Sequence, residues 1–408
     1  MLLPIFLFDC INHFFSKTYK TENGKRFPFS HSCAIIFQTS PARRGEGGTA
    51  VTEPSRSRAI EFYRFLFSIV VCLFHFRIKG GFSEPTGYFN AGYLGVEFFS
   101  IISGCFLMES IRRGRSALEA GGALPDLTCC FAARRFARLY PHYLLTLIAF
   151  LSLRVCFLHT LTLKELVRDG FFEWFLLQSF GTSFVVLLFW YVSALFLGSV
   201  LLYWLGLAWK DHFPIALAFA APLLFSLFAQ YCGTLDCTMS PAPAASQGLW
   251  RVIAGLALGC VVSCLVRRLR PILQGRFALA STVLEAGLLL VLLLLMYRTY
   301  RSPWDFIAAA LLALLALSVL LGNSLLTRLL DNPVSGFLGK ISYGVYLNQC
   351  FFLHLYGPVI PVRSYWRSAA AFLLLNILLS VFTLWLSQCL AALMAGFLRF
   401  LSQSPRQT

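Results

Sequence analysis

The sequence predicts an all-α fold, a polytopic transmembrane helical bundle of about ten spans. Hydrophobic residues make up 58% of the 408 residues and charged residues only 13%, whereas a soluble domain is about 45–50% apolar and about 25% charged. A helix that crosses a bilayer needs roughly 20 mostly apolar residues, and the chain contains many such windows. Because lipid offers no water to satisfy backbone groups, we expect these windows to form helices of one bundle.

Residues 1–58 differ from the rest of the chain. The stretch 17–58 is polar and has no sustained hydrophobic period, and the apolar start 1–8 is too short for a span. This start also lacks the basic region and small-residue cleavage site of a signal peptide. We therefore expect residues 1–58 to be either a disordered tail or the product of a misassigned start, with Val51 as the alternative first residue.

Apolar windows follow and define the expected spans: 59–78, 91–110, 141–158, 184–206, 213–231, 249–266, 278–297, 304–322, 341–360 and 368–397. Two segments between them are predicted to be interfacial helices, 127–139 and 161–177. Each carries basic residues together with aromatic residues, a combination typical of the headgroup region. Residues 401–408 are expected to be a short cytoplasmic tail.

The charge pattern predicts the orientation of the bundle. With the N-terminus inside, the inner loops carry roughly twice as many Lys and Arg residues as the outer loops, in agreement with the positive-inside rule. This rule explains the formal net charge of +16 without a nucleic-acid partner. We expect a multi-pass protein of the cell membrane with both termini in the cytoplasm.

The 13 cysteines lie mostly in apolar windows, where a thiol behaves as a small hydrophobic group. Their spacing does not match a paired zinc motif, so no metal is expected. Cys232 and Cys237 lie in a polar loop and could form a disulfide if that loop faces an oxidising compartment.

The first span carries a polar stripe. Arg64 and His75 are eleven residues apart, which is three helical turns plus about 20°, so they share a face at depths about 16 Å apart. Glu61 and Ser68 lie near the same stripe. A charge at the centre of a span costs about 2.5 kcal/mol or more and usually marks a function. The alternative is that Arg64 snorkels to the surface and His75 bonds a core carbonyl.

Glu97, in the second span, lies about two turns from the outer end and thus at a depth similar to that of His75. Its carboxylate could hold one ring nitrogen of His75 and raise the basicity of the other. The alternative is an interfacial Glu97 that is exposed to water. In the same span, Ser103 and Gly104 favour close helix packing.

Three arginines, Arg134, Arg135 and Arg138, precede Pro141 at the predicted start of the third span. Arginines at this position are ordinary positive-inside anchors. The functional alternative is a phosphate site, because the guanidinium fork matches phosphate oxygens.

Five motifs, in order, resemble those of the membrane-bound acyltransferase-3 family: Arg64-x10-His75, GVEFFSIISGCFL at 95–107, RRFARLYPHY at 134–143, WYVSALFLGSVLLY at 190–203 and FLGKISYGVYLNQ at 337–349. Two positions depart from the family pattern. The late motif commonly ends in Trp-His, and here it ends in Asn348-Gln349. The middle motif commonly carries Ser-x-Glu, and here Ser193 is followed by Ala194 and Leu195.

The resemblance implies an acyltransferase-3-like transmembrane domain over residues 59–400. Such proteins are acyl-CoA-dependent O-acyltransferases of surface glycans, so acetyl-CoA is the expected donor, and a cell-surface glycan or lipid-linked sugar is the expected acceptor. On this basis we expect His75 to act as general base or to carry the acyl group, and Glu97 to orient His75. Arg64, Arg135 and Arg138 are expected to bind the donor phosphates.

The rival function is a transporter or lipid flippase, in which Arg64, Glu97 and His75 would line a substrate or proton path. Inverted repeats would favour transport, and the sequence has no apparent internal repeat. A non-catalytic membrane scaffold is a third class, but it leaves the polar stripe unexplained.

Overall fold

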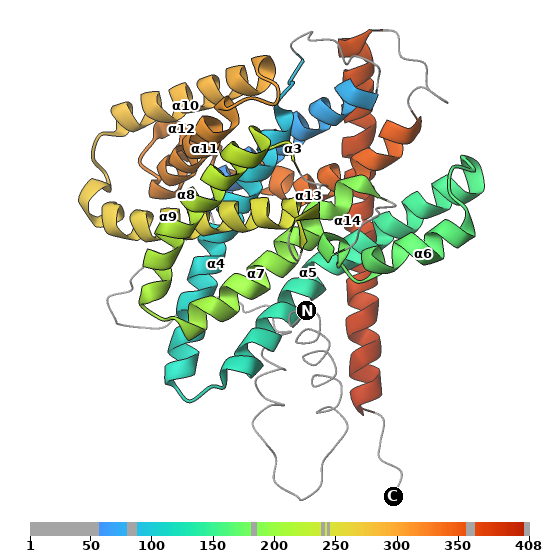
Figure 1. Cartoon of the computed structure of the whole chain (residues 1–408), viewed down its shortest axis with the longest axis horizontal. Coiled ribbons are helices and arrows are strands. Elements are labelled where there is room, and N and C mark those ends of the chain that lie inside the picture. Colours follow the sequence, from blue (N-terminus) through green and yellow to red (C-terminus); the bar gives the residue numbers. More distant parts are fainter. Residues whose placement is uncertain are drawn as a thin grey trace, which may run out of the picture.

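The computed structural model of the chain describes residues 57–79, 88–180, 186–237, 241–242, 245–355 and 364–403. They form a helical bundle, with one long helix, α14, along its side (Figure 1). Almost all of the predicted tail 1–58 and most of the predicted tail 401–408 lie outside the described residues, so both remain predictions.

Each of the ten apolar windows corresponds to a long helix. These helices are α3 (Arg58–Lys79), α4 (Gly95–Glu119), α5 (Leu124–Ser152), α7 (Trp190–Ala208), α8 (His212–Cys232), α9 (Gln247–Leu273), α10 (Ala278–Arg298), α11 (Trp304–Leu321), α13 (Pro333–Leu355) and α14 (Tyr365–Gln403). Shorter elements join them: the helices α6 (Leu163–Trp174) and α12 (Leu325–Leu330), the helical turns η1 (Gly92–Leu94), η2 (Leu153–Phe157), η3 (Gln178–Phe180) and η4 (Leu187–Phe189), and a two-residue ladder of β1 (Pro241–Ala242) with β2 (Ala245–Ser246). The predicted all-α fold is confirmed.

In the part of the chain that the structure describes, nine helices are long and apolar enough to cross a membrane. The tenth predicted span, 341–360, falls on α13, which is outside this group although it has 23 residues. Its polar residues Lys340, Asn348 and Gln349 lower its hydropathy. Asn348 and Gln349 are fully buried, so their polar groups are satisfied inside the protein, as the bilayer requires.

The third predicted span is corrected by the structure. We predicted an interfacial helix at 127–139 and a separate span that begins near Pro141, but α5 is one continuous helix with Pro141 in its interior. Proline usually ends or kinks a helix because it removes a backbone donor, yet membrane helices tolerate it where neighbouring groups compensate. The other predicted interfacial helix is present as α6, which begins with a capping box between Thr162 and Glu165.

Two close helix crossings position the functional residues. At the crossing of α4 and α9, a Cβ atom on Gly104 would lie 2.1 Å from the carbonyl oxygen of Leu256, and one on Gly259 would lie 1.9 Å from that of Ile101. The two backbones are therefore in contact, and the predicted close packing at Gly104 is confirmed. At the crossing of α3 and α13, a Cβ atom on Gly339 would lie 2.2 Å from the Cβ atom of Glu61.

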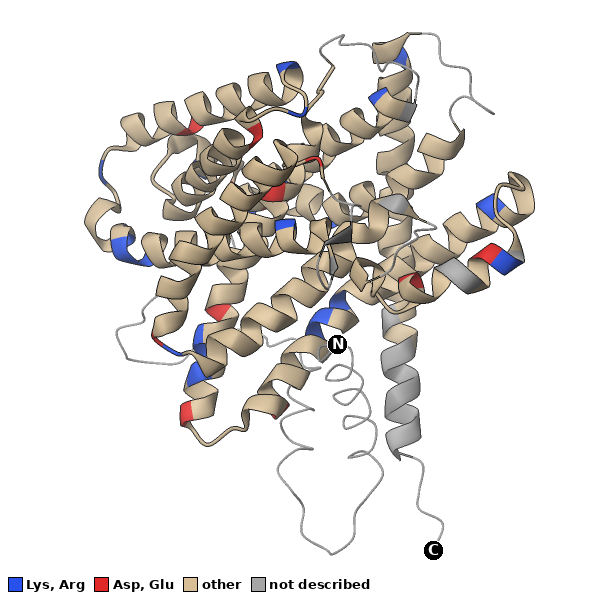
Figure 2. Ribbon diagram, in the orientation of Figure 1, with Lys and Arg blue, Asp and Glu red and all other residues tan. Residues whose placement is uncertain are grey.

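The positions of the charged residues also fit a membrane-spanning bundle. Figure 2 shows Lys and Arg mostly near helix ends and connecting turns, with few charges along the middle of the helices. This distribution suits a multi-pass membrane protein. Which face lies in the cytoplasm stays a prediction.

Candidate active site

The polar stripe of α3 faces the protein interior. Glu61, Ser68 and Cys72 are buried, while Arg64 and His75 are half-buried. Arg64 donates through Nη1 to Glu61 Oε2 at 2.7 Å. Because α13 packs along this face of α3, the stripe is part of a helix interface and does not face lipid.

His75 is held by Gln349 of α13. The ring Nδ1 lies 3.1 Å from Gln349 Oε1, and Gln349 Nε2 donates to the carbonyl oxygen of Tyr346 at 2.8 Å, which turns the amide oxygen towards His75. An amide oxygen only accepts, so Nδ1 carries the proton, and the neutral ring keeps its lone pair on Nε2. This is the tautomer that a general base requires.

Glu97 does not hold His75, and that prediction is wrong. Its carboxylate pairs with Arg251 of α9, with Oε1 2.6 Å from Nε and Oε2 2.7 Å from Nη2, and both side chains are at most 2% exposed. Arg251 also donates to the carbonyl oxygen of Tyr93 at 3.0 Å, and its guanidinium lies 5.7 Å from the ring centre of Trp190. The Gly104–Gly259 crossing explains the pairing, because it brings α4 against α9 two turns away.

Arg251 was missed in the sequence analysis, although a signal was present. It lies inside the apolar window 249–266, and a charge within a span marks a buried partner or a functional site. Its bidentate contact with Glu97 is the stronger kind of charge-assisted hydrogen bond. Removing one partner of a buried pair typically costs about 3–5 kcal/mol, so Arg251 is central to the stability of this region.

The three arginines predicted to bind a donor gather in one region. Tyr191 of α7 interacts electrostatically with both Arg64 of α3 and Arg135 of α5. Arg135 in turn interacts electrostatically with Arg138, which is exposed. Side chains from three helices are therefore within electrostatic range of one another in this region. Their role in donor binding stays a prediction.

A second buried polar network joins α5, α13 and α14. His142 Nε2 lies 3.1 Å from Thr383 Oγ1, which accepts from Asn348 Nδ2 at 2.8 Å. The amide oxygen of Asn348 accepts from Thr146 Oγ1 at 3.1 Å. Asn348, one of the departures from the family motif, therefore connects three helices. His142 lay in the motif at 134–143 but was not singled out.

A loop lies close to the His75 end of the site. Asp305, fully buried at the start of α11, accepts hydrogen bonds from Tyr93 Oη at 2.8 Å, Thr234 Oγ1 at 2.7 Å and the backbone N–H of Leu235 at 2.9 Å. Next to this anchor, Asp236 interacts electrostatically with His75 and Arg251.

Asp236 also accepts from Arg301 Nε at 2.9 Å, and this bond raises the pKa of the Arg301 guanidinium. At the two ends of the same loop, the thiols of Cys232 and Cys237 both point to Gln247 Oε1. They are free thiols in the structure, and the disulfide between them stays a prediction.

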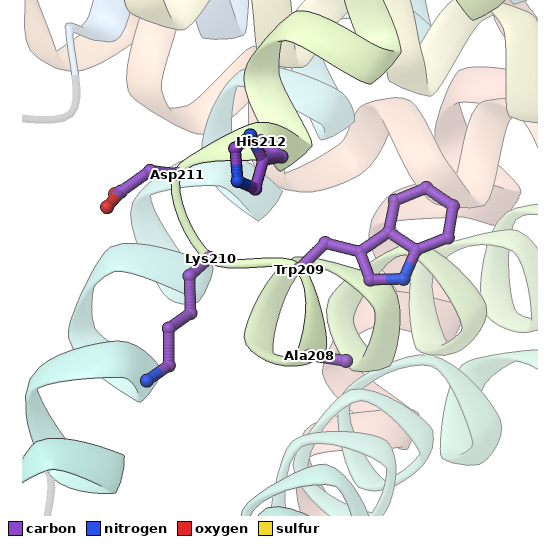
Figure 3. A pocket seen from close by; sticks show the side chains of 5 residues that line it. All are labelled: Ala208, Trp209, Lys210, Asp211 and His212. Atoms are coloured by element: carbon purple, nitrogen blue, oxygen red, sulfur yellow. The ribbon is translucent and has the colours of Figure 1, made fainter.

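Two other features lie apart from this site. Among the described residues, no group of three or more His, Cys, Asp or Glu side chains is arranged to hold a metal ion. A surface hollow at the α7–α8 turn is lined by residues 208–212 (Figure 3). None of these residues is among the polar residues of the site described above.

The chain matches one known protein family over a range that contains all of these residues. The family model of the acyltransferase domain named acyltransferase 3 matches residues 57–392. This range is well over half of the 408 residues and includes every residue of the site. No curated protein and no solved structure matches the chain.

Proposed function

We propose, because this chain belongs to the acyltransferase 3 family of membrane acyltransferases, that it transfers an acetyl group from acetyl-CoA to a hydroxyl of a cell-surface glycan or lipid-linked sugar. The observation that carries this proposal is the geometry of His75. Gln349 fixes its proton on Nδ1, which leaves Nε2 ready to accept a proton from the acceptor hydroxyl.

The spacing along α3 supports a donor that reaches across part of the membrane. Arg64 precedes His75 by eleven residues, which corresponds to about 16 Å along the helix. Donor phosphates bound by Arg64, Arg135 and Arg138 would let the thioester end extend towards His75. Guanidinium groups suit this role because they stay charged and offer several donors to phosphate oxygens.

The reaction proceeds by general base catalysis. His75 Nε2 takes the proton of the acceptor hydroxyl while its oxygen attacks the thioester carbonyl carbon. The tetrahedral intermediate then collapses, the C–S bond breaks, and the thiolate leaves with the proton from the imidazolium. Gln349 holds the ring during both proton transfers, and the Glu97–Arg251 pair joins α4 to α9.

The experiment that tests this function is a donor-dependence assay. Purified protein in detergent is given acetyl-CoA with and without candidate glycans or lipid-linked sugars, and the release of free CoA thiol is measured. We expect release that depends on both protein and acceptor. The proposal would be contradicted if no CoA thiol were released with any acceptor, or if none of the acceptors increased its release.

A further inference from the structure

The loop that follows α8 is fixed to the start of α11. Thr234 Oγ1 and the backbone N–H of Leu235 both donate to Asp305 Oδ2, at 2.7 Å and 2.9 Å. Thr234 Oγ1 also accepts from the backbone N–H of Asp236 at 3.0 Å. Asp305 is fully buried, and hydrogen bonds to a charged group are among the stronger ones in proteins. These contacts hold the backbone of Asp236 in a defined place.

Tyr93 connects this loop to the neighbourhood of His75. Its hydroxyl donates to the same Asp305 oxygen at 2.8 Å, and its ring packs edge-on against Phe74, with 5.2 Å between the ring centres. Phe74 directly precedes His75 on α3, and the centres of these two rings are 5.1 Å apart. The loop and the histidine are thus joined through one buried side chain, and the carboxylate of Asp236 interacts electrostatically with His75.

The other polar contacts described near the histidine ring carry no net charge. Gln349, which contacts the ring from α13, is neutral, and Glu97 and Arg251 neutralise one another. Asp236 is paired with Arg301, but the Arg301 side chain is 56% exposed, whereas that of Asp236 is 18% exposed. Water and salt therefore screen the arginine more than the carboxylate, so part of the negative charge of Asp236 stays effective inside the protein.

We propose that Asp236 is a positioning residue that acts through His75, because its negative charge stabilises the imidazolium that forms when Nε2 takes the proton of the acceptor hydroxyl. This inference rests on the proposed function. In that step a neutral ring becomes a cation, and a carboxylate within electrostatic range favours the cationic form. Glu97, which the sequence predicts as the carboxylate partner of His75, is instead paired with Arg251.

A purely structural role for Asp236 is the competing explanation, in which its ion pair with Arg301 only ties the loop to the turn before α11. The two explanations differ in what they predict for Arg301. If the ion pair acts by holding the loop, removal of either partner has the same effect. If the charge of Asp236 acts on His75, removal of the Arg301 guanidinium leaves that charge in place and less neutralised, so activity is kept or raised.

The test compares Asp236→Asn with Arg301→Gln and with Asp211→Asn, a control that removes an exposed carboxylate at the α7–α8 turn. Acetyl transfer from acetyl-CoA is measured against pH in membranes that contain equal amounts of each variant. For Asp236→Asn we expect transfer to fall about tenfold at neutral pH, a size that the loss of one partly screened charge allows. We also expect the midpoint of the acidic limb of the pH–rate profile to move to lower pH, because the imidazolium has lost a stabilising charge.

Asp211→Asn should transfer at the wild-type rate, Arg301→Gln at the wild-type rate or faster, and Asp236→Glu should recover most of the activity because it restores the charge. The midpoint of the limb does not depend on the amount of folded protein, so it separates a lost charge from a lost fold. An unchanged midpoint in Asp236→Asn, or equal losses in Asp236→Asn and Arg301→Gln, would overturn the inference and leave the proposed function standing. A wild type that transfers no acetyl group to any acceptor would refute both.

Discussion

Two contacts of single residues define the chemistry of this site: the hydrogen bond that fixes the proton of His75, and the ion pair between Glu97 and Arg251. Gln349 has no charge, yet its amide decides which nitrogen of His75 is basic. Buried Glu97 and Arg251 neutralise one another, so neither is available as an isolated charge. The hydrogen bonds of His75 and of the Glu97–Arg251 pair are therefore formed before any substrate binds, and such preorganisation is a common source of catalysis in enzymes.

Changing Gln349 tests the control of the His75 tautomer. In Gln349→Leu no acceptor holds the proton on Nδ1, so in part of the molecules the proton of His75 moves to Nε2, which is then no longer basic. We therefore expect kcat to fall about tenfold or more, up to the full contribution of a general base. Gln349→Glu keeps an acceptor at the same place and should retain more activity than the leucine variant. Equal losses in both variants would show that the amide has another role.

Changing the Glu97–Arg251 pair tests whether Glu97 is structural or catalytic. Arg251→Met alone leaves a buried carboxylate without its partner and should destabilise the protein by about 3–5 kcal/mol. The double variant Glu97→Leu with Arg251→Met removes both charges and should recover much of this loss, as thermal unfolding in detergent can measure. If the recovered double variant also transfers acyl groups, Glu97 has no catalytic role.

The sequence predicted part of the site at the residue scale. A charge or histidine inside an apolar window is visible without a structure, which is why Arg64, Glu97 and His75 were found, and Arg251 carried the same signal. The pairing was not predictable, because helical depth alone allows Glu97 to meet either His75 or Arg251. Only the packing of α4 on α9 decides between them. Gln349 stood out only as a departure from the late family motif, and because it is uncharged, its hydropathy did not point to a contact with His75.

Helices meet at glycines in this bundle, and their contacts determine which side chains share a site. The crossing of α4 and α9 brings Glu97 to Arg251, while that of α3 and α13 brings His75 to Gln349. α5 continues through Pro141, where we predicted that a helix would start. The prediction was wrong because a proline in the first turn of a helix cannot be distinguished by sequence from a proline inside a packed membrane helix.

Alanine substitution at Gly104 tests the α4–α9 crossing. The added Cβ atom would meet the backbone carbonyl of Leu256 at 2.1 Å, so the two helices must move apart, and we expect a loss of about 1–3 kcal/mol in stability together with lower activity. Gly287 of α10 is the matched control, because a Cβ atom there meets nothing within 4 Å. Gly287→Ala should leave the unfolding temperature unchanged or slightly raised. Similar behaviour of the two variants would contradict the tight crossing.

The molecule as a whole is a multi-pass bundle whose site residues come from helices far apart in the sequence. Composition predicted the fold class and the approximate spans, since the bilayer permits few alternatives. The order of helices around the site was not predictable from one sequence, because hydropathy gives the length of each helix but not its neighbours. Orientation is a further whole-molecule property that the charge pattern alone predicts.

The orientation can be tested with reporters. Both termini are expected in the cytoplasm because the inner loops carry the excess of Lys and Arg. A reporter that is active only in the cytoplasm should therefore be active when it is fused after Ser402, and a reporter that is active only outside the cell should not. Activity of an externally active reporter at this position would contradict the predicted cytoplasmic C-terminus and would mean that a span was miscounted.

His75 provides the most direct test of the account. Acyl transfer from acetyl-CoA should be compared in membranes that contain equal amounts of wild type, His75→Ala and, as control, His212→Ala, a substitution of an exposed histidine at the α7–α8 turn. We predict that His75→Ala loses about 10²–10⁴-fold in rate, as expected for a general base, while His212→Ala transfers acetyl groups at the wild-type rate. Near-normal transfer by His75→Ala would contradict the central claim.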